Sequence, residues 1–290
     1  MSKEITMPTS PNFLSSTFTL TRAIGQTVSP FTGKQRTQEY DMVLWSAQVT
    51  LPPMKRSVAA NWQSWFARLK GSTNYFKFTD PDALTNQGTY DEDDLIATPR
   101  VTDTSTALSF ATSTITSGDS IFGNALVGDY IFVTGATNED NNGTHKISAV
   151  TSATVVVTTS TFTTESNTAS CKVQQNVKGA TGLSLTASTN SAAGTIAVGD
   201  YLGVLDAAST TGTPKQLLLV TELSTQTAVG GGLNKISVGT EPKLRADITS
   251  GHFVKFASPK GKFRLDSNIV EWSANRNSNY TFSFSCTEVI

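Results

Sequence analysis

The sequence has few of the residues from which most catalytic and metal sites are built. Its 290 residues include only two cysteines and two histidines. It contains no H-E-x-x-H, C-x-x-C or G-x-S-x-G motif, and neither His145 nor His252 has a catalytic partner nearby in the sequence. The sequence therefore predicts a protein that is not an enzyme, with no catalytic residue, no cofactor and no metal site.

The two cysteines, Cys171 and Cys286, lie far apart in the chain. Small secreted domains that depend on disulfides have a much denser pattern of cysteines. We therefore expect both thiols to be reduced and to lie in the core or in strands, with a bridge as the disfavoured alternative.

Charge and long apolar runs are also scarce. Charged residues make up 16% of the chain and the formal net charge is -1, whereas a nucleic-acid surface needs clustered Lys and Arg. Runs such as Leu217–Val220 are too short to span a bilayer. Residues 1–20 lack the apolar segment of a signal peptide. We expect no nucleic-acid binding, no membrane segment and synthesis in the cytoplasm.

Two polar segments allow a second interpretation. Residues 138–143 match the opening of a calcium loop, but Ala149 stands where that motif needs a bidentate Glu, which favours a polar hairpin loop. The acidic residues 91–94 could bind calcium or a basic partner, and a solvated linker is favoured. Residues 230–232, three glycines, predict a flexible turn without a ligand.

What the chain does contain is strand pattern and one amphipathic helix. Alternate residues from Val43 to Leu51 are apolar and predict a strand with one buried face, which Pro52 and Pro53 end. Apolar residues at helical spacing then predict a helix over about residues 55–70, with Gly71 in the C′ position. The sequence predicts a mainly β fold: a sandwich-like or barrel-like core with one packed helix, and a small all-β domain inserted into it.

The tryptophans suggest how the domains are organised. Three lie between residues 45 and 65 and one is Trp272, while residues 96–176 have none. Because large aromatic side chains mark cores, we expect residues 1–95 and 177–290 to form one domain, into which residues 96–176 are inserted. Val198–Leu202 echoes Val127–Ile131, which indicates either a duplication or one turn used twice; the second is favoured because little else aligns.

Several motifs carry a family resemblance. W-x-A-x-V-T-L-P-P-M-x-R, A-x-x-W, L-K-G and F-x-F-x-D-P lie in the first 81 residues, and K-G-K-F-R-L, W-x-A-N-R and Y-x-F-S-F-S-C-x-E lie in the last 31. Together they resemble tail proteins of tailed bacteriophages, distal tail proteins in particular. The insert departs from the many relatives that join the two halves directly.

The resemblance implies a virion structural protein, made in the host cytoplasm, that forms a ring joining the tail tube to the tip or baseplate. A hexamer is expected, with a trimer as the alternative. Tail-tube and tip or hub proteins are the expected neighbours, and the insert could touch the host surface. The alternative function is a glycan-binding tail or adhesion protein. The residues expected to form the core are Trp45, Trp62, Trp65, Phe66, Leu69, Trp272, Phe282 and Phe284.

Overall fold

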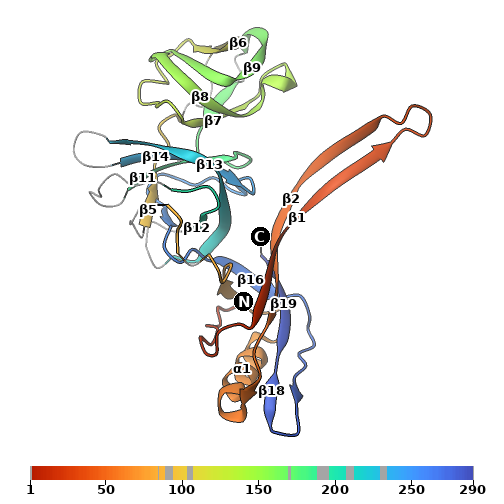
Figure 1. The fold of residues 1–290 in the computed structure, drawn as a ribbon. Helices are drawn as coiled ribbons and strands as arrows, with labels where there is room; N and C mark the ends of the chain where they lie inside the picture. Colours follow the sequence, from red (N-terminus) through yellow and green to blue (C-terminus); the bar gives the residue numbers. More distant parts are fainter. Residues whose placement is uncertain are drawn as a thin grey trace. The chain divides into compact units, whose positions relative to one another are not determined.

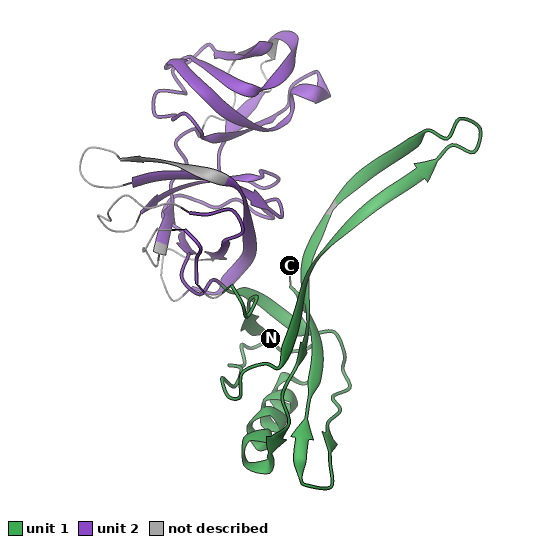
Figure 2. Cartoon of the chain, viewed as in Figure 1, with its two compact units in different colours: residues 1–84, 260–290 green, residues 85–259 purple. Residues whose placement is uncertain are grey.

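The computed structural model describes residues 2–83, 85–88, 94–102, 107–168, 171–187, 196–206, 212–228 and 234–289. The chain forms two compact units (Figure 2): Met1–Leu84 with Lys260–Ile290, here unit 1, and Thr85–Pro259, here unit 2. Strands make up 51% of the structure and helices 7%. The fold is therefore mainly β with one α-helix among the described residues, as the sequence predicts.

Unit 1 is built on a five-stranded antiparallel sheet to which both ends of the chain contribute. In spatial order, its strands are β1 (Ser15–Val28), β2 (Gln35–Thr50), β19 (Ser283–Glu288), β16 (Gly261–Leu265) and β4 (Phe76–Phe78). The alternation predicted for β2 is confirmed, since Val43, Trp45, Ala47 and Val49 are buried. The last strand of the chain lies in the middle of this sheet.

Helix α1 (Arg56–Leu69) packs its apolar face on this sheet (Figure 1). It follows β3 (Met54–Lys55) and ends where Lys70 and Gly71 both adopt positive φ. A Cβ on Gly71 would lie 2.5 Å from the Asn268 side chain and 2.9 Å from its Cα. Gly71 is therefore required both by its backbone conformation and by the close approach of Asn268.

The aromatic core of unit 1 joins residues from the two ends of the chain. The rings of Trp65 and Phe284 lie 5.6 Å apart, and those of Phe66 and Phe282 stack at 5.9 Å. Seven of the eight residues predicted to form the core are buried: Trp45, Trp62, Trp65, Phe66, Leu69, Phe282 and Phe284.

Trp272 is the exception, and the prediction for it is wrong, since half of its side chain is exposed. It precedes a small sheet of β17 (Ser273–Ala274), β18 (Asn279–Thr281) and β3. Residues 271–278 are all exposed, so nothing in this segment covers the indole, whose ring contacts Phe282 at 6.4 Å.

Unit 2 contains a closed barrel with a further β module inserted into it. The barrel order is β11 (Gly182–Ala187), β14 (Asn234–Glu241), β13 (Pro214–Ala228), β12 (Tyr201–Leu205), β15 (Phe253–Lys255) and β5 (Asp94–Ala97). Between β5 and β11 the chain forms a second sheet of β10 (Lys172–Gln174), β7 (Tyr130–Thr134), β8 (Gly143–Ser152), β9 (Val155–Thr168) and β6 (Leu108–Ser117), with a short 3-10 helix, η1 (Glu139–Asn141). Each of the two has an apolar core of its own.

The barrel and the inner module repeat one strand order. The series β6-β9-β8-β7-β10 matches β11-β14-β13-β12-β15 strand for strand, and all these pairings are antiparallel. The same turn stands directly before β7 in the inner module and before β12 in the barrel. Asp129 accepts a hydrogen bond from the Leu126 N–H at 2.9 Å, as Asp200 does from the Ala197 N–H at 2.8 Å. The likeness noted in the sequence therefore extends beyond the turn to the whole five-strand module.

These boundaries differ from the predicted domains. The core of the inner module runs from Val101 to Val173, inside the predicted insert of residues 96–176. However, β11 to β15, which the sequence assigned to the terminal domain, close the barrel of unit 2 instead, and only residues 260–290 return to unit 1. The barrel core is mostly aliphatic, with Phe256 as its one fully buried aromatic residue in the described part, and it lacks tryptophan, so the distribution of tryptophans could not reveal it.

Candidate self-association surface

The most unusual surface of unit 1 is the distal half of the β1–β2 hairpin. β19 pairs with β2 only from Ser46 to Thr50, whereas β1 pairs with β2 from Thr50 to Gln35. Residues 22–42, here called the ribbon, therefore form a two-stranded extension that no third strand supports in the described part of the chain (Figure 1). Because isolated two-stranded hairpins are marginally stable in water, the ribbon is suited to pairing with another surface.

The ribbon exposes large apolar side chains. Ten such residues are exposed in the described part of the chain, and five of them lie in the ribbon: Ile24, Val28, Phe31, Tyr40 and Met42. Ile24 and Val28 lie on one face of the ribbon and Tyr40 on the other, over Gly25. Scattered exposed apolar residues are normal, but a concentration of them in one segment is typical of an interaction site. The ribbon is therefore the best candidate for a functional surface in this molecule.

The ribbon has a defined conformation of its own. A β-bulge interrupts the register between Arg22 and Ile24, and Arg22 forms an exposed ion pair with Glu39 at 3.2 Å. The Tyr40 ring lies against Gly25, where an added Cβ would come within 3.1 Å of it. Bulges increase twist and end pairing at sheet edges, so this one marks where the ribbon leaves the sheet.

A tight turn closes the ribbon and presents Phe31 to solvent. Ser29 N–H donates to the Lys34 carbonyl, and Gly33 N–H donates to the Ser29 carbonyl, both at 2.9 Å. Gly33 takes a φ of +64°, which a glycine adopts without strain. Phe31 is 95% exposed at this turn.

The two edges of the unit 1 sheet are not equivalent. β4, at one edge, is bordered by the N-terminal segment, because Ile5 N–H donates to the Tyr75 carbonyl at 2.8 Å and Tyr75 N–H to the Lys3 carbonyl at 3.1 Å. β1, at the other edge, pairs with no strand but β2 in the described residues. A long edge strand with free N–H and C=O groups can accept a strand from another chain.

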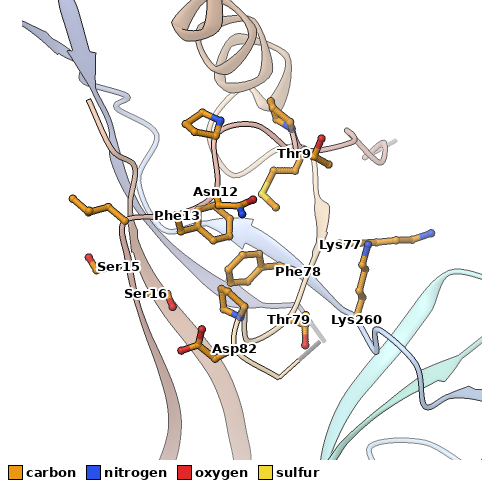
Figure 3. Close-up of a pocket in the computed structure, with 15 residues that line it drawn as sticks. Thr9, Asn12, Phe13, Ser15, Ser16, Lys77, Phe78, Thr79, Asp82 and Lys260 are labelled. Atoms are coloured by element: carbon orange, nitrogen blue, oxygen red, sulfur yellow. The ribbon is translucent and has the colours of Figure 1, made fainter. Parts of the chain in front are cut away.

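A cleft of about 720 Å³ lies at the base of the same hairpin (Figure 3). Its floor includes Phe13 and Phe78, whose rings meet edge to face at 5.9 Å. Thr79 is 5% exposed, and its hydroxyl has no hydrogen-bond partner in the described structure. Lys77, which pairs with Glu4 at 3.2 Å, and Lys260 lie together in Figure 3, apart from Asp82.

The sequence offered two segments as possible calcium sites, residues 138–143 and residues 91–94. The loop at residues 138–143 is closed by the Glu165 carboxylate, which accepts hydrogen bonds from the backbone N–H groups of Thr137 and Asn138 and from the Asn141 side chain. Burial acts to raise the pKa of Glu165, but these hydrogen bonds outweigh it and lower the pKa. Of the acidic residues 91–94, only the backbone of Asp94 is described, and residues 230–232 lie outside the described part.

In the described residues, no three His, Cys, Asp or Glu side chains gather where they could hold a metal ion. His145 is buried, with its Nε2 3.1 Å from the Asn141 carbonyl oxygen and its ring against Phe162. Burial lowers the pKa of His145, although the hydrogen bond to Asn141 acts to raise it. Cys171 and Cys286 are buried and form no disulfide, and burial raises the pKa of the Cys286 thiol.

Two polar clusters inside unit 2 have structural roles. Arg100 and Asp129 form a buried two-pronged ion pair, and the Ser237 hydroxyl donates to the same carboxylate at 2.6 Å. The Tyr130 hydroxyl donates to Glu222, which also pairs with Lys146 at 2.9 Å. Burial and this carboxylate raise the pKa of Tyr130. Both clusters connect the inner module to the barrel.

Each described aromatic side chain of unit 2 is buried or half-buried: Phe110, Phe122, Tyr130, Phe132, Phe162, Tyr201, Phe253 and Phe256. No described helix is long and apolar enough to cross a membrane. No protein-family model matches this chain, and no curated protein matches it.

The sequence reasoning passed over the ribbon, although a signal for it exists. Alternation of Thr with apolar residues from Thr17 to Thr21 predicts a strand, and Pro30 to Gly33 has the composition of a turn between two long strand patterns. Sequence alone could not show that the distal half of this hairpin extends beyond the sheet, because that depends on where β19 stops pairing.

Proposed function

We propose that this chain is a virion structural protein of a bacteriophage tail, forming a ring at the distal end that joins the tail tube to the tip or baseplate. The observation that carries the proposal is the ribbon, an apolar two-stranded extension that its own sheet leaves unsupported. The resemblance of both chain ends to distal tail proteins adds the particular place in the virion. Assembly, rather than a reaction, is the proposed activity.

The unequal sheet edges favour a ring over a two-fold pair. A contact between two different patches on each subunit repeats from copy to copy and closes when the rotation allows it. Unit 1 offers two such patches, the ribbon with its open edge and the cleft at the base of the hairpin. The formal net charge of -1 gives little repulsion between copies. We expect a hexamer, with a trimer as the alternative.

The remaining partners follow from the place in the tail. Tail-tube and tip or hub proteins are the proposed neighbours above and below the ring. Unit 2 is one continuous stretch, Thr85–Pro259, between the two segments that form unit 1. It is therefore a compact body of its own that could meet other tail proteins or the host surface.

Reconstruction of the tail from purified virions, with this chain fitted into the map, tests the proposal. We expect one ring of this chain at the distal end, with unit 1 forming the contacts between copies. A single copy, a position in the head, or stacked rings along the whole tube would each overturn the distal-ring assignment.

A further inference from the structure

The tip of the ribbon and the cleft are complementary features of one molecule. Phe31 is the most exposed of the large apolar side chains in the described chain, at 95%. The cleft at the hairpin base has the size of pockets that enclose small ligands, roughly 300–1,000 Å³, and an aromatic floor of Phe13 and Phe78. Aromatic rings that meet edge to face gain energy beyond the burial of their area.

The tip cannot fill the cleft of its own chain. Ser15 and Ser16 line the cleft, and Phe31 lies beyond the far end of β1. A strand of 14 residues extends about 45 Å at roughly 3.3 Å per residue. The hairpin is paired on both sides of the bulge between Arg22 and Ile24, so Phe31 is held far from the cleft at its base.

Charge favours one orientation of a second copy. Lys34 and Arg36 follow Phe31 closely, and both are exposed. At the cleft, Asp82 lines one part and neighbours Asp80, whose carboxylate accepts a hydrogen bond from the Asp82 N–H at 3.2 Å. The cleft lysines lie elsewhere, and Lys77 is already paired with Glu4. A tip entering beside Asp82 would place its cations next to carboxylates.

The cleft also contains an unsatisfied polar group. The hydroxyl of Thr79 is buried without a hydrogen-bond partner in the described structure. Buried polar groups without a partner are uncommon and costly in native proteins.

We propose that the ribbon tip of one copy places Phe31 in the cleft of the next copy, against Phe13 and Phe78. This inference rests on the proposed ring, and it names the contact that builds the ring. The tip and the cleft are different patches, so each copy gives one and receives one. Such a contact propagates around a ring and closes without a free end.

Cysteine cross-linking of the full chain at high protein concentration tests the contact. The double variant Thr32→Cys with Asn12→Cys keeps Phe31 and places one thiol at the tip and one at the mouth of the cleft. The native cysteines are buried and stay silent. Under mild oxidation we expect a ladder of covalent multimers that ends at the size of the ring.

Three controls make the result specific. Each single variant should give no ladder, and dimers from Thr32→Cys alone would indicate tips that meet each other. The pair Thr32→Cys with Asn277→Cys places the second thiol on an exposed turn outside the cleft. We expect no ladder from that pair. No ladder from the cleft pair, or equal ladders from both pairs, would overturn the inference.

A substitution at the tip gives a second measurement. Phe31→Asp should weaken self-association at least tenfold in sedimentation, while the melting temperature stays unchanged because the side chain is exposed. An unchanged association constant would contradict the inference. If the virion map shows a distal ring but the cysteine pair gives no ladder, only this contact is rejected. If the pair gives a ladder but the chain lies elsewhere in the virion, only the distal-tail assignment is rejected.

Discussion

Units 1 and 2 manage their apolar surface in opposite ways. Unit 1 covers an aromatic core with one helix and leaves the ribbon exposed, whereas unit 2 closes a barrel and buries its aliphatic side chains. Of the ten large apolar residues exposed in the described chain, eight belong to unit 1. The two in unit 2, Val127 and Val198, occupy the same position of the repeated turn. The comparison teaches that the exposed apolar surface is concentrated in unit 1, whereas unit 2 buries nearly all of its large apolar side chains.

The largest expected loss of stability comes from a substitution inside unit 2. Asp129→Ala leaves the buried Arg100 without its partner, and removal of one member of a buried pair typically costs about 3–5 kcal/mol. The matched control is Asp200→Ala in the barrel, where the equivalent carboxylate accepts from backbone N–H groups of Gln87 and Ala197. We expect about 1–3 kcal/mol there, measured by urea titration.

Equal losses in the two variants would show that the Arg100 ion pair adds nothing to the turn that both modules share. A loss at Asp129 alone would mean that the hydrogen bonds of the Asp200 turn are not needed. Either result would change how the two repeated modules are compared.

The second prediction concerns the stability of unit 1 and a buried side chain of helix α1. Trp62 is fully buried, and its indole N–H donates to the Ser10 carbonyl at 3.0 Å. Trp62→Ala should therefore cost about 3–5 kcal/mol of unfolding free energy. Trp272→Ala, at a half-exposed position, should cost less than about 1 kcal/mol. A small loss at Trp62, read from denaturant unfolding, would contradict its place in the core.

The third experiment separates the units. Replacement of residues 85–259 by a short Gly/Ser linker should leave a cooperatively folding unit 1, because the sheet and helix α1 lie outside the excised range. We expect association to be retained, as measured by sedimentation of the shortened chain. An unfolded product in circular dichroism, beside a folded full chain, would show that unit 1 depends on unit 2.

A small effect on stability with a large effect on association is expected at the ribbon. Ile24→Ser removes a side chain that is 56% exposed, and surface substitutions usually change stability by less than about 0.5 kcal/mol. Thermal melting should therefore be unchanged, while self-association weakens. Thr17→Ser, on the part of β1 that the sheet supports, is the control for both measurements. A lowered melting temperature would mean that the ribbon packs within its own chain.

The smallest effect is a response to mild acid, and it should be confined to unit 2. Burial lowers the pKa of His145 below its unfolded value near 6.5. The folded state then binds fewer protons than the unfolded state, so stability is present above about pH 6.5 and is lost as the pH falls below it. Melting of the full chain between pH 7 and 5.5 should follow this trend, and His145→Gln should flatten it. A rise in stability over that range would contradict the burial argument.

The sequence was most informative for elements whose apolar residues follow a clear periodicity within one short segment. Alternation in Val43–Leu51 and helical spacing up to Leu69 predicted β2 and α1 correctly, because each pattern has one dominant buried face. The tryptophans also indicated that the two ends of the chain share one aromatic core, in which Phe282 and Phe284 are buried. These inferences needed no knowledge of distant contacts beyond a shared aromatic core.

The features that the sequence did not predict depend on contacts between segments that are distant in the chain. Exposure of Trp272 follows from how little of the chain passes over it, and exposure of Ile24 follows from where β19 ends. Strands of a barrel and strands of a sandwich have the same alternation, so β11 to β15 could not be assigned to unit 2 from pattern alone. The cleft combines residues 7–16 with residues 77–82 and Lys260, which no local motif brings together.

The position of β19 in the middle of the unit 1 sheet sets an order for folding during translation. The inner module is complete once β10 has left the ribosome, and the barrel follows with β15. Unit 1 must wait for β19, because β2 and β16 are joined only through it. The nascent chain thus folds from the inside outward. The ribbon therefore acquires its rigid base only after β19 has been made, and a chain that stops before β19 lacks the strand that supports β2.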